Sequence, residues 1–265
     1  MDALDQYKAN QKVAWSNFAL LECLTATVAP QLVRFAGIRP GQKVLDVGCG
    51  TGVVSLTAAR AGAQVQGVDL TPELVARARE NAALMKLDVT FQEGDAEALP
   101  FPDATFDVVV SQFGHMFAPR PDVTLAEMLR VLKPGGTIAF STWPPELFVG
   151  SWFKMMGKYA PPPPPGVSPP VQWGDVNIVR ERLGSAVKDV MFTRATMMVN
   201  ALSPQHYRIF MSENFGPAKK LLESLDANDP AKAAMLRSEM EALTQVYFHD
   251  NQIRQDFLIT RAIKP

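Results

Sequence analysis

The sequence contains few cysteines, few histidines and no cluster of basic residues. Its 265 residues include 2 cysteines, Cys23 and Cys49, which are too few for a disulfide framework or a four-ligand zinc site. The 3 histidines and the carboxylates show no metal-ligand spacing. The net charge is −1 at pH 7 and no run of Lys or Arg occurs. Because proteins that hold a nucleic-acid backbone usually carry a basic patch, nucleic acid is disfavoured as a substrate.

The chain also lacks a long hydrophobic segment. No run of about 18 apolar residues occurs, and residues 1–12 are polar, without the apolar core of a signal peptide. Hydrophobic residues nevertheless make up 47% of the chain, which is enough to bury a substantial core. We therefore expect a compact cytoplasmic protein that does not bind a membrane. The oligomeric state stays open, with a homodimer as one option.

The most informative stretch is residues 44–52, with the sequence VLDVGCGTG. An apolar strand pattern ends at Asp46, and three glycines at alternate positions then lead into a helical pattern. Glycine permits positive φ and close approach of a ligand to the backbone, while a helix start offers unpaired N–H groups. A dinucleotide-binding loop needs its third glycine at position 53, which is Val53 here. The loop predicts a ligand with a polar or anionic end.

Strand and helix patterns alternate after this loop. Strands are expected at 65–69, 89–93, 106–112 and 137–142, with helices at 73–85 and 121–132 and a turn at 133–136. This βαβ alternation predicts a parallel sheet with helices on both faces. Asp46, Asp69 and Asp95 would then lie at the carboxyl ends of successive strands, which is where such sheets bind ligands.

The N-terminal stretch, residues 4–36, shows helical periodicity, and we expect Pro30 to divide it into two helices. Such a leader could cover the ligand cleft. Trp15 is a candidate lid residue, and burial in the core is the alternative because large aromatic side chains are mostly buried.

The C-terminal part departs from a minimal α/β pattern. Its expected elements are an apolar helix at 147–159, a proline-rich connector at 161–170, a helix at 175–183, a strand at 187–199, helices at 204–225 and 230–248, and a last strand at 256–263. The apolar helix either lines a pocket, through Phe148, Trp152, Phe153, Met155, Met156 and Tyr159, or packs its face into the core. The connector is expected to be stiff, and a docking site for a proline-binding partner is the alternative.

Two carboxylates suit an adenosine ligand. Asp69 can accept hydrogen bonds from both ribose hydroxyls, which fits any adenosine-containing cofactor, including a nicotinamide dinucleotide. Asp95 can accept from the exocyclic amine of adenine, and the backbone N–H of Ala96 can donate to a ring nitrogen. A turn or cap role would explain one such carboxylate, but three at successive strand ends favour a ligand site.

Four segments in this order and spacing closely resemble class I S-adenosylmethionine-dependent methyltransferases of the ubiquinone/menaquinone-biosynthesis type: VLDVGCGTG, GVDL, GDAEALPFPDATFDVVVS and RVLKPGG. They cover roughly residues 36–143. The later stretches FVGSWF, PPPPPGVSPP and WGD look like a broad bacterial branch of that family whose members mostly lack an assigned acceptor.

The resemblance implies an α/β fold with a Rossmann-like, seven-stranded sheet, N-terminal helices and a helical insertion before the last strand. It also implies three parts. They are an N-terminal helical cap at 1–36, a cofactor-binding core at 37–143, and at 144–265 the remainder of the sheet with inserted helices that form an acceptor cap.

The resemblance further implies S-adenosylmethionine as cofactor and S-adenosylhomocysteine as product. Gly48 and Gly50 would border the methionine moiety within a loop that also includes Cys49, Thr51 and Gly52. Asp46 would act nearby through hydrogen bonds or water, and Asp69 would hold the ribose. Leu70 would pack on adenine, whose edge Asp95 and Ala96 would bind. Ser111 and Gln112 would offer backbone carbonyls to the cofactor ammonium group.

The reaction implied is an in-line attack on the activated methyl group by an O, N or C atom of a small-molecule acceptor. We expect this acceptor to be apolar or amphipathic. Base- and glutamine-methylating enzymes often carry an Asn/Asp-Pro-Pro-aromatic signature, whereas residues 111–114 are Ser-Gln-Phe-Gly. His115 is the candidate general base, and a structural or substrate-shaping role is its alternative. A nicotinamide-dependent oxidoreductase and a non-catalytic S-adenosylmethionine-binding module are the rival interpretations.

Overall fold

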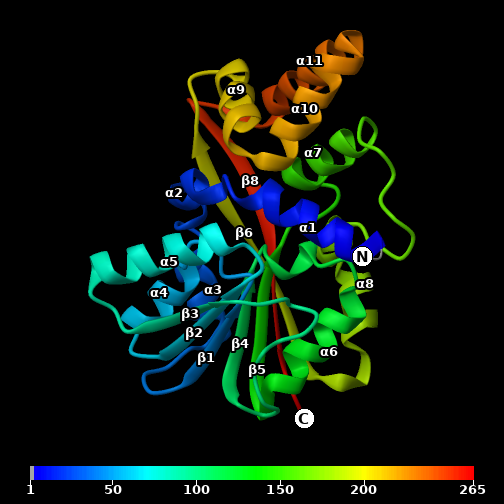
Figure 1. Ribbon diagram of the computed structural model, residues 1–265. Coiled ribbons are helices and arrows are strands. Elements are labelled where there is room, and N and C mark those ends of the chain that lie inside the picture. The colour runs from blue at the N-terminus through cyan, green and yellow to red at the C-terminus, as the bar shows by residue number, and fades with distance from the viewer. Residues whose placement is uncertain (1–2) are drawn as a thin grey trace.

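A mixed β-sheet forms the centre of the protein in a computed structural model that describes residues 3–265 (Figure 1), so the first two residues of the expected cap lie outside it. Along the sheet the strands follow the order β3-β2-β1-β4-β5-β8-β6, and β7 pairs with β8. Their bounds are β1 Lys43–Val47, β2 Gln64–Asp69, β3 Val89–Glu93, β4 Phe106–Gln112, β5 Leu132–Thr142, β6 Lys188–Asn200, β7 Phe248–His249 and β8 Gln252–Ile263.

Strands β1 to β5 pair in parallel, and β8 runs antiparallel between β5 and β6. This confirms the Rossmann-like α/β fold. The sheet of the described chain has 8 strands rather than the expected seven, because the two-residue strand β7 forms a small extra pair with β8.

The helices are α1 Ala3–Trp15, α2 Glu22–Thr25, α3 Ala29–Ala36, α4 Val53–Arg60, α5 Pro72–Met85, α6 Pro121–Val131, α7 Phe148–Gly157, α8 Val176–Leu183, α9 Pro204–Asn214, α10 Gly216–Asn228 and α11 Pro230–Tyr247. Short 3-10 turns occur at Phe18–Leu21, His115–Phe117, Pro170–Gly174 and Gly184–Ala186. Helices α3, α4 and α5 lie on one side of the sheet, and α6 and α8 lie on the other (Figure 1).

Several helix ends follow from local chemistry. Asp175 begins α8, because its side chain accepts hydrogen bonds from the backbone N–H groups of Asn177 and Ile178. Pro72 occupies the first turn of α5, where a missing N–H costs nothing. Gly37 ends α3 in the left-handed conformation with φ 70°.

Three expected boundaries need correction. The N-terminal stretch breaks first after Trp15, and Pro30 lies in the first turn of α3, so proline starts a helix there instead of dividing two long ones. The expected turn at 133–136 is an irregularity within β5, where the ladder shifts from the pair Phe106 and Leu132 to the next pair along β4. The expected helix 204–225 is two helices that meet at Phe215.

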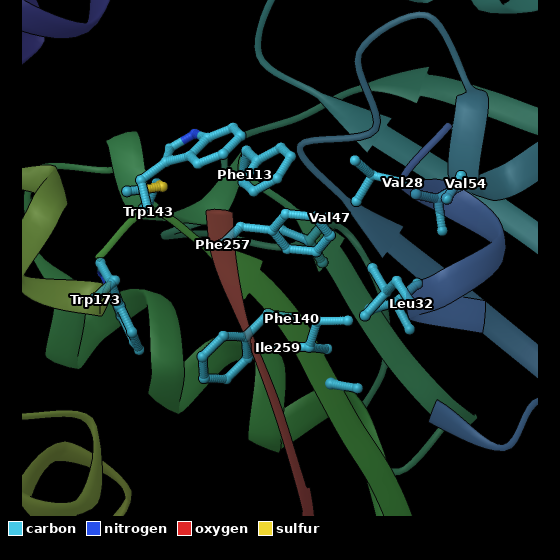
Figure 2. Packing of buried hydrophobic residues seen from close by; sticks show 14 of the residues in the cluster. Val28, Leu32, Val47, Val54, Phe113, Phe140, Trp143, Trp173, Phe257 and Ile259 are labelled. Carbon is cyan, nitrogen blue, oxygen red and sulfur yellow. The ribbon is translucent and has the colours of Figure 1, made fainter. Parts of the chain in front are cut away.

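The main hydrophobic core lies between the sheet and its helices. Val28 and Leu32 pack from the α3 side near Val47 and Val54, as Figure 2 shows. On the other side of that view, the rings of Phe113 and Trp143 stack with centroids 3.9 Å apart, and Phe257 of β8 meets both rings edge-on. The core therefore extends to the carboxyl end of the parallel strands.

Helices α7, α9, α10 and α11 gather beyond that end of the sheet, and α1 lies between them and the sheet (Figure 1). Helix α1 contacts α10, and α11 contacts both α7 and α9. Within residues 3–265 no single helix is long and apolar enough to span a membrane; the bent pair Phe18–Thr25 and Ala29–Ala36, at 61° to each other, passes that test jointly by length and composition alone.

Candidate active site

The glycine loop follows β1 and leads into α4, as its sequence predicts. Asp46 lies at 1% exposure beneath it, and its Oδ2 accepts from the backbone N–H of Ser55 at 3.0 Å and from the Ser55 hydroxyl at 2.6 Å. Ser55 is in the first turn of α4, so Asp46 satisfies a backbone donor that the helix leaves unpaired. Burial raises the pKa of Asp46 to about 7, with a further contribution from Asp69 and opposed by the Ser55 hydrogen bonds.

The glycine loop touches the loop after β4 very closely. A Cβ atom on Gly114 would lie 2.5 Å from the carbonyl oxygen of Gly48, and one on Gly48, which has φ 64°, would lie 2.8 Å from the Cα of Gly114. Only glycine at both positions lets the two backbones meet in this way. The contact fixes the position of the glycine loop against the end of β4.

Asp69, at the end of β2, organises the glycine loop from the side. One carboxylate oxygen accepts from the backbone N–H of Gly50 at 2.8 Å, and the other accepts from that of Thr71 at 2.9 Å. Burial raises the pKa of Asp69, while these backbone hydrogen bonds act in the opposite direction. Each oxygen keeps a second lone pair, so the carboxylate can still accept from two ribose hydroxyls.

Asp95 lies beside a charged cluster that the sequence did not reveal. Lys8 of α1 places its Nζ 2.6 Å from Asp95 Oδ2 and 2.6 Å from Glu97 Oε2. Glu97 is nearly buried and also pairs with Arg120 at 2.8 Å. Lys12 of α1 forms a further ion pair with Glu93. These pairs attach α1 to the end of β3, next to the expected adenine position.

At the end of β4, Ser111 and Gln112 have different roles. The Ser111 hydroxyl donates to the carbonyl oxygen of Val47 at 2.6 Å and accepts from the backbone N–H of His115, so it joins two strands. The Gln112 amide donates to the carbonyl oxygen of Thr25 at 2.9 Å, and its Oε1 is buried without a partner in the described chain. Gln112 faces the cavity, whereas Ser111 lies behind it.

His115 is buried at 1% exposure and lies outside the cavity. Its ring packs 4.7 Å from the rings of both Phe140 and Trp173, and neither nitrogen has a hydrogen-bond partner among residues 3–265. Burial lowers the pKa of the imidazole to about 3, and the charge of Arg182 adds to this. A neutral ring enclosed by aromatic side chains does not support the base role expected from the sequence.

One continuous cavity of about 220 Å³ connects these groups with an aromatic region. Its polar half is lined by Lys8, Gln11, Gly48, Cys49, Gly50, Thr51, Asp69, Leu70, Thr71, Asp95, Ala96 and Gln112. Its apolar half is lined by Trp15, Phe117, Trp143, Phe148, Val149, Trp152, Phe153, Met197, Tyr207, Met211, Phe215 and Gln255. Of the expected cofactor residues, Asp46, Gly52 and Ser111 support the wall from behind.

The two halves of the cavity suit different chemical groups. Carboxylates, backbone N–H groups and glycines in the polar half match the hydroxyls, the amine and the bulk of an adenosine with a methionine tail. Aromatic and methionine side chains in the other half match an apolar molecule. The described residues contain no group of three His, Cys, Asp or Glu that could hold a metal ion.

The sequence-based expectations named Trp15 as a candidate lid residue but missed Lys8 and Gln11 on the same helix. Lys8, Gln11 and Trp15 follow the spacing i, i+3, i+7, which places them on one face of α1, and all three line the cavity. Trp15 contacts Phe117 with ring centroids 4.6 Å apart and Phe215 at 5.4 Å. Helical spacing could have indicated this face, but no local signal shows which surface it covers.

Helix α7 combines the two roles considered for its apolar residues, because some of them line the cavity and others pack into the core. Phe148, Trp152 and Phe153 line the cavity, while Met155 and Met156 are buried in the core away from it. Tyr159 lies outside the cavity, with its hydroxyl hydrogen-bonded to Glu239.

Comparison with known proteins agrees with this geometry. A family model described as "Methyltransferase domain" matches residues 45–140. An uncharacterized protein of Mycobacterium tuberculosis is 38% identical over 247 residues, which cover 93% of this chain and 90% of that protein. The demethylmenaquinone methyltransferase of Deinococcus radiodurans is 43% identical over 108 residues, or 39% of this chain and 44% of that enzyme.

A solved structure has the same fold. The phosphoethanolamine N-methyltransferase 2 of Haemonchus contortus, in complex with phosphomonomethylethanolamine and S-adenosylhomocysteine, gives a TM-score of 0.60 at 22% identity, over 94% of this chain and 57% of that one.

The strand order and the glycine loop after β1 define a Rossmann-like fold, which binds ligands at the carboxyl ends of its parallel strands. The chain belongs to the class I S-adenosylmethionine-dependent methyltransferases, and it is an enzyme of that family. Its cofactor is S-adenosylmethionine, which supplies an activated methyl group. The family membership favours methyl transfer over the nicotinamide and non-catalytic alternatives.

Proposed function

We propose that this methyltransferase acts on a small apolar or amphipathic molecule and methylates an O, N or C atom of it. The observation that carries the proposal is the continuity of the cavity, whose polar half ends where an aromatic and methionine-lined half begins. Such side chains favour an uncharged ligand, because burying a charge among them without a partner is costly.

The residues that hold the cofactor are, in this proposal, those of the polar half. Asp69 binds the ribose, Leu70 packs on the adenine, and Asp95 with the Ala96 backbone binds the adenine edge. Gly48 and Gly50 border the methionine tail, next to the side chain of Gln112. Helix α1, held by Lys8, covers this half and excludes water from it.

The apolar half supports an acceptor atom that is nucleophilic without help from a protein base. Its lining within the described chain includes no Asp, Glu, His or Lys. The only ionisable hydroxyl there is that of Tyr207, and burial raises its pKa, so it stays protonated at neutral pH. The task of these side chains is then to orient the acceptor and to keep water out.

Calorimetric titration with S-adenosylmethionine, S-adenosylhomocysteine and NADH in parallel is the first test. We expect binding of the first two ligands and no binding of NADH. Transfer of a labelled methyl group to a library of uncharged aromatic and aliphatic molecules, compared with a library of charged ones, then tests the acceptor class. Methylation restricted to charged acceptors would contradict the proposal.

A further inference from the structure

Two polar side chains interrupt the apolar half of the cavity. Tyr207 of α9 and Gln255 of β8 are each only 4% exposed, and both line the cavity. The amide Nε2 of Gln255 donates to the Tyr207 hydroxyl oxygen at 3.0 Å. The ring of Phe148 packs against the ring of Tyr207 at 5.8 Å.

Gln255 occupies a position of β8 where the alternation of buried and exposed residues predicts an apolar side chain. The inward face of β8 carries Ile253, Gln255, Phe257 and Ile259, and the other three are fully or almost fully buried apolar side chains. A buried amide in such a row destabilises the fold unless its donors and its acceptor find partners. A selected function for this amide would explain why the row contains it.

The pair leaves hydrogen-bonding capacity unused on the cavity side. The Tyr207 oxygen accepts from Gln255, so its own O–H remains available as a donor. Gln255 Oε1 makes no hydrogen bond to any of residues 3–265, so it remains available as an acceptor. A ligand hydroxyl could use both groups, and a ligand carbonyl could use the Tyr207 O–H.

Tyr207 and Gln255 also lie away from the polar half of the cavity. The ladder between β5 and β8 stops at the pair Thr142 and Leu258. Gln255 lies three residues before Leu258, on the part of β8 that extends past the end of β5. At about 3.3 Å per residue, this puts Gln255 roughly 10 Å beyond the end of that ladder. An acceptor that reaches this pair therefore extends past the carboxyl end of β5.

We propose that Tyr207 and Gln255 are specificity-determining residues that bind a hydroxyl or carbonyl oxygen of the acceptor, at the end opposite to the methylated atom. The inference rests on the proposed function, because it takes the apolar half as the acceptor site. The ligand class is an uncharged, largely apolar molecule with one oxygen function at its far end.

The test uses two probes of the same shape, 4-ethylphenol and 4-ethyltoluene, which differ by a hydroxyl in place of a methyl group. Binding of each to the 265-residue protein is measured by calorimetry, with and without S-adenosylhomocysteine. The decisive variant is the double substitution Tyr207→Phe with Gln255→Leu, because it removes both partners together and leaves no buried group unpaired. Thr244→Val is the control, since it removes a buried hydroxyl on α11 that lies outside the cavity.

We expect the preference for 4-ethylphenol, expressed as the ratio of the two dissociation constants, to fall about tenfold in the double variant, the effect of losing a hydrogen bond in a buried site. The control should keep the wild-type ratio. An unchanged ratio in the folded double variant, or a lack of binding of both probes to the wild-type protein, overturns the proposal. Failure of S-adenosylhomocysteine to bind would instead count against the proposed function, because the probe ratio is measured without it as well.

Discussion

Asp69 gives the sharpest test of the cofactor site, through the substitution Asp69→Asn. Its two oxygens accept from the backbone N–H groups of Gly50 and Thr71 at 2.8 and 2.9 Å. Asparagine keeps one oxygen, but its NH₂ group must then face one of these N–H donors. The substitution therefore weakens the glycine loop and removes the acceptor that we propose for the ribose.

The magnitude follows from the type of hydrogen bond that is lost. Hydrogen bonds to a charged group contribute about 1.5 to 3 kcal/mol each, and one such loss raises a dissociation constant roughly 10- to 150-fold. We expect an increase in this range for S-adenosylhomocysteine, measured by calorimetry at pH 8. Circular dichroism and thermal unfolding verify that the variant is folded.

Asp107→Asn provides the matched control. Asp107 also accepts a backbone N–H, that of Lys43 at 2.8 Å, but it lies at the start of β4, at the opposite end of the strand from the cavity. Its substitution should lower the melting temperature and leave the affinity for S-adenosylhomocysteine unchanged. An unaltered affinity in folded Asp69→Asn, or an equal loss in Asp107→Asn, would refute the reasoning.

Three further predictions concern His115, Asp46 and Gly114. In the folded protein the pKa of His115 is about 3, below the unfolded value near 6.5, so the free energy of unfolding decreases as pH falls between these values. His115→Phe should flatten that decrease by about 1.4 kcal/mol per pH unit in melting curves recorded from pH 4 to 7. An unchanged slope would contradict this prediction. For Asp46 the pH dependence of stability has the opposite sign, because its folded pKa of about 7 exceeds the unfolded value near 3.9. The free energy of unfolding therefore decreases as pH rises between these two values. Asp46→Asn should remove this decrease in denaturant titrations at pH 5 and 8. Gly114→Ala should displace Gly48 and lower the free energy of unfolding by about 1 to 3 kcal/mol. Gly157→Ala, at a position with open space around it, should be neutral. Equal melting temperatures of the two variants would argue against the close contact between Gly114 and Gly48.

The parallel half of the sheet was predictable because its signals are local. Strands β1 and β4 are mostly apolar runs, and β2 and β3 are short segments in which apolar and polar residues mix. Asp69 and Asp95 follow directly from the rule that ligands bind at the carboxyl ends of parallel strands. The resemblance to the methyltransferases then supplied the role that is predicted for each cofactor residue. These predictions depended on residues close together in the sequence.

The apolar half of the cavity and the contacts of α1 were harder to predict because both join distant segments of the chain. Gln255 meets Tyr207 across 48 positions of the chain, and Lys8 meets Asp95 across 87. Neither contact leaves a periodic or spacing signal. His115 shows the converse problem, since its position after β4 suggested a role in catalysis, while its burial beside Trp173 depends on the path of residues 170–174.

The position of β8 has a consequence for the order in which the protein takes shape during synthesis. β8 lies between β5 and β6, yet the ribosome makes it after both of them and after α9 to α11. The glycine loop and strands β1 to β4 can pair while translation continues, but β6 has no neighbour until β8 emerges. The nascent chain can therefore form the strands beside the polar half of the cavity first. The wall that contains Tyr207 and Gln255 closes only when β8 is inserted between β5 and β6.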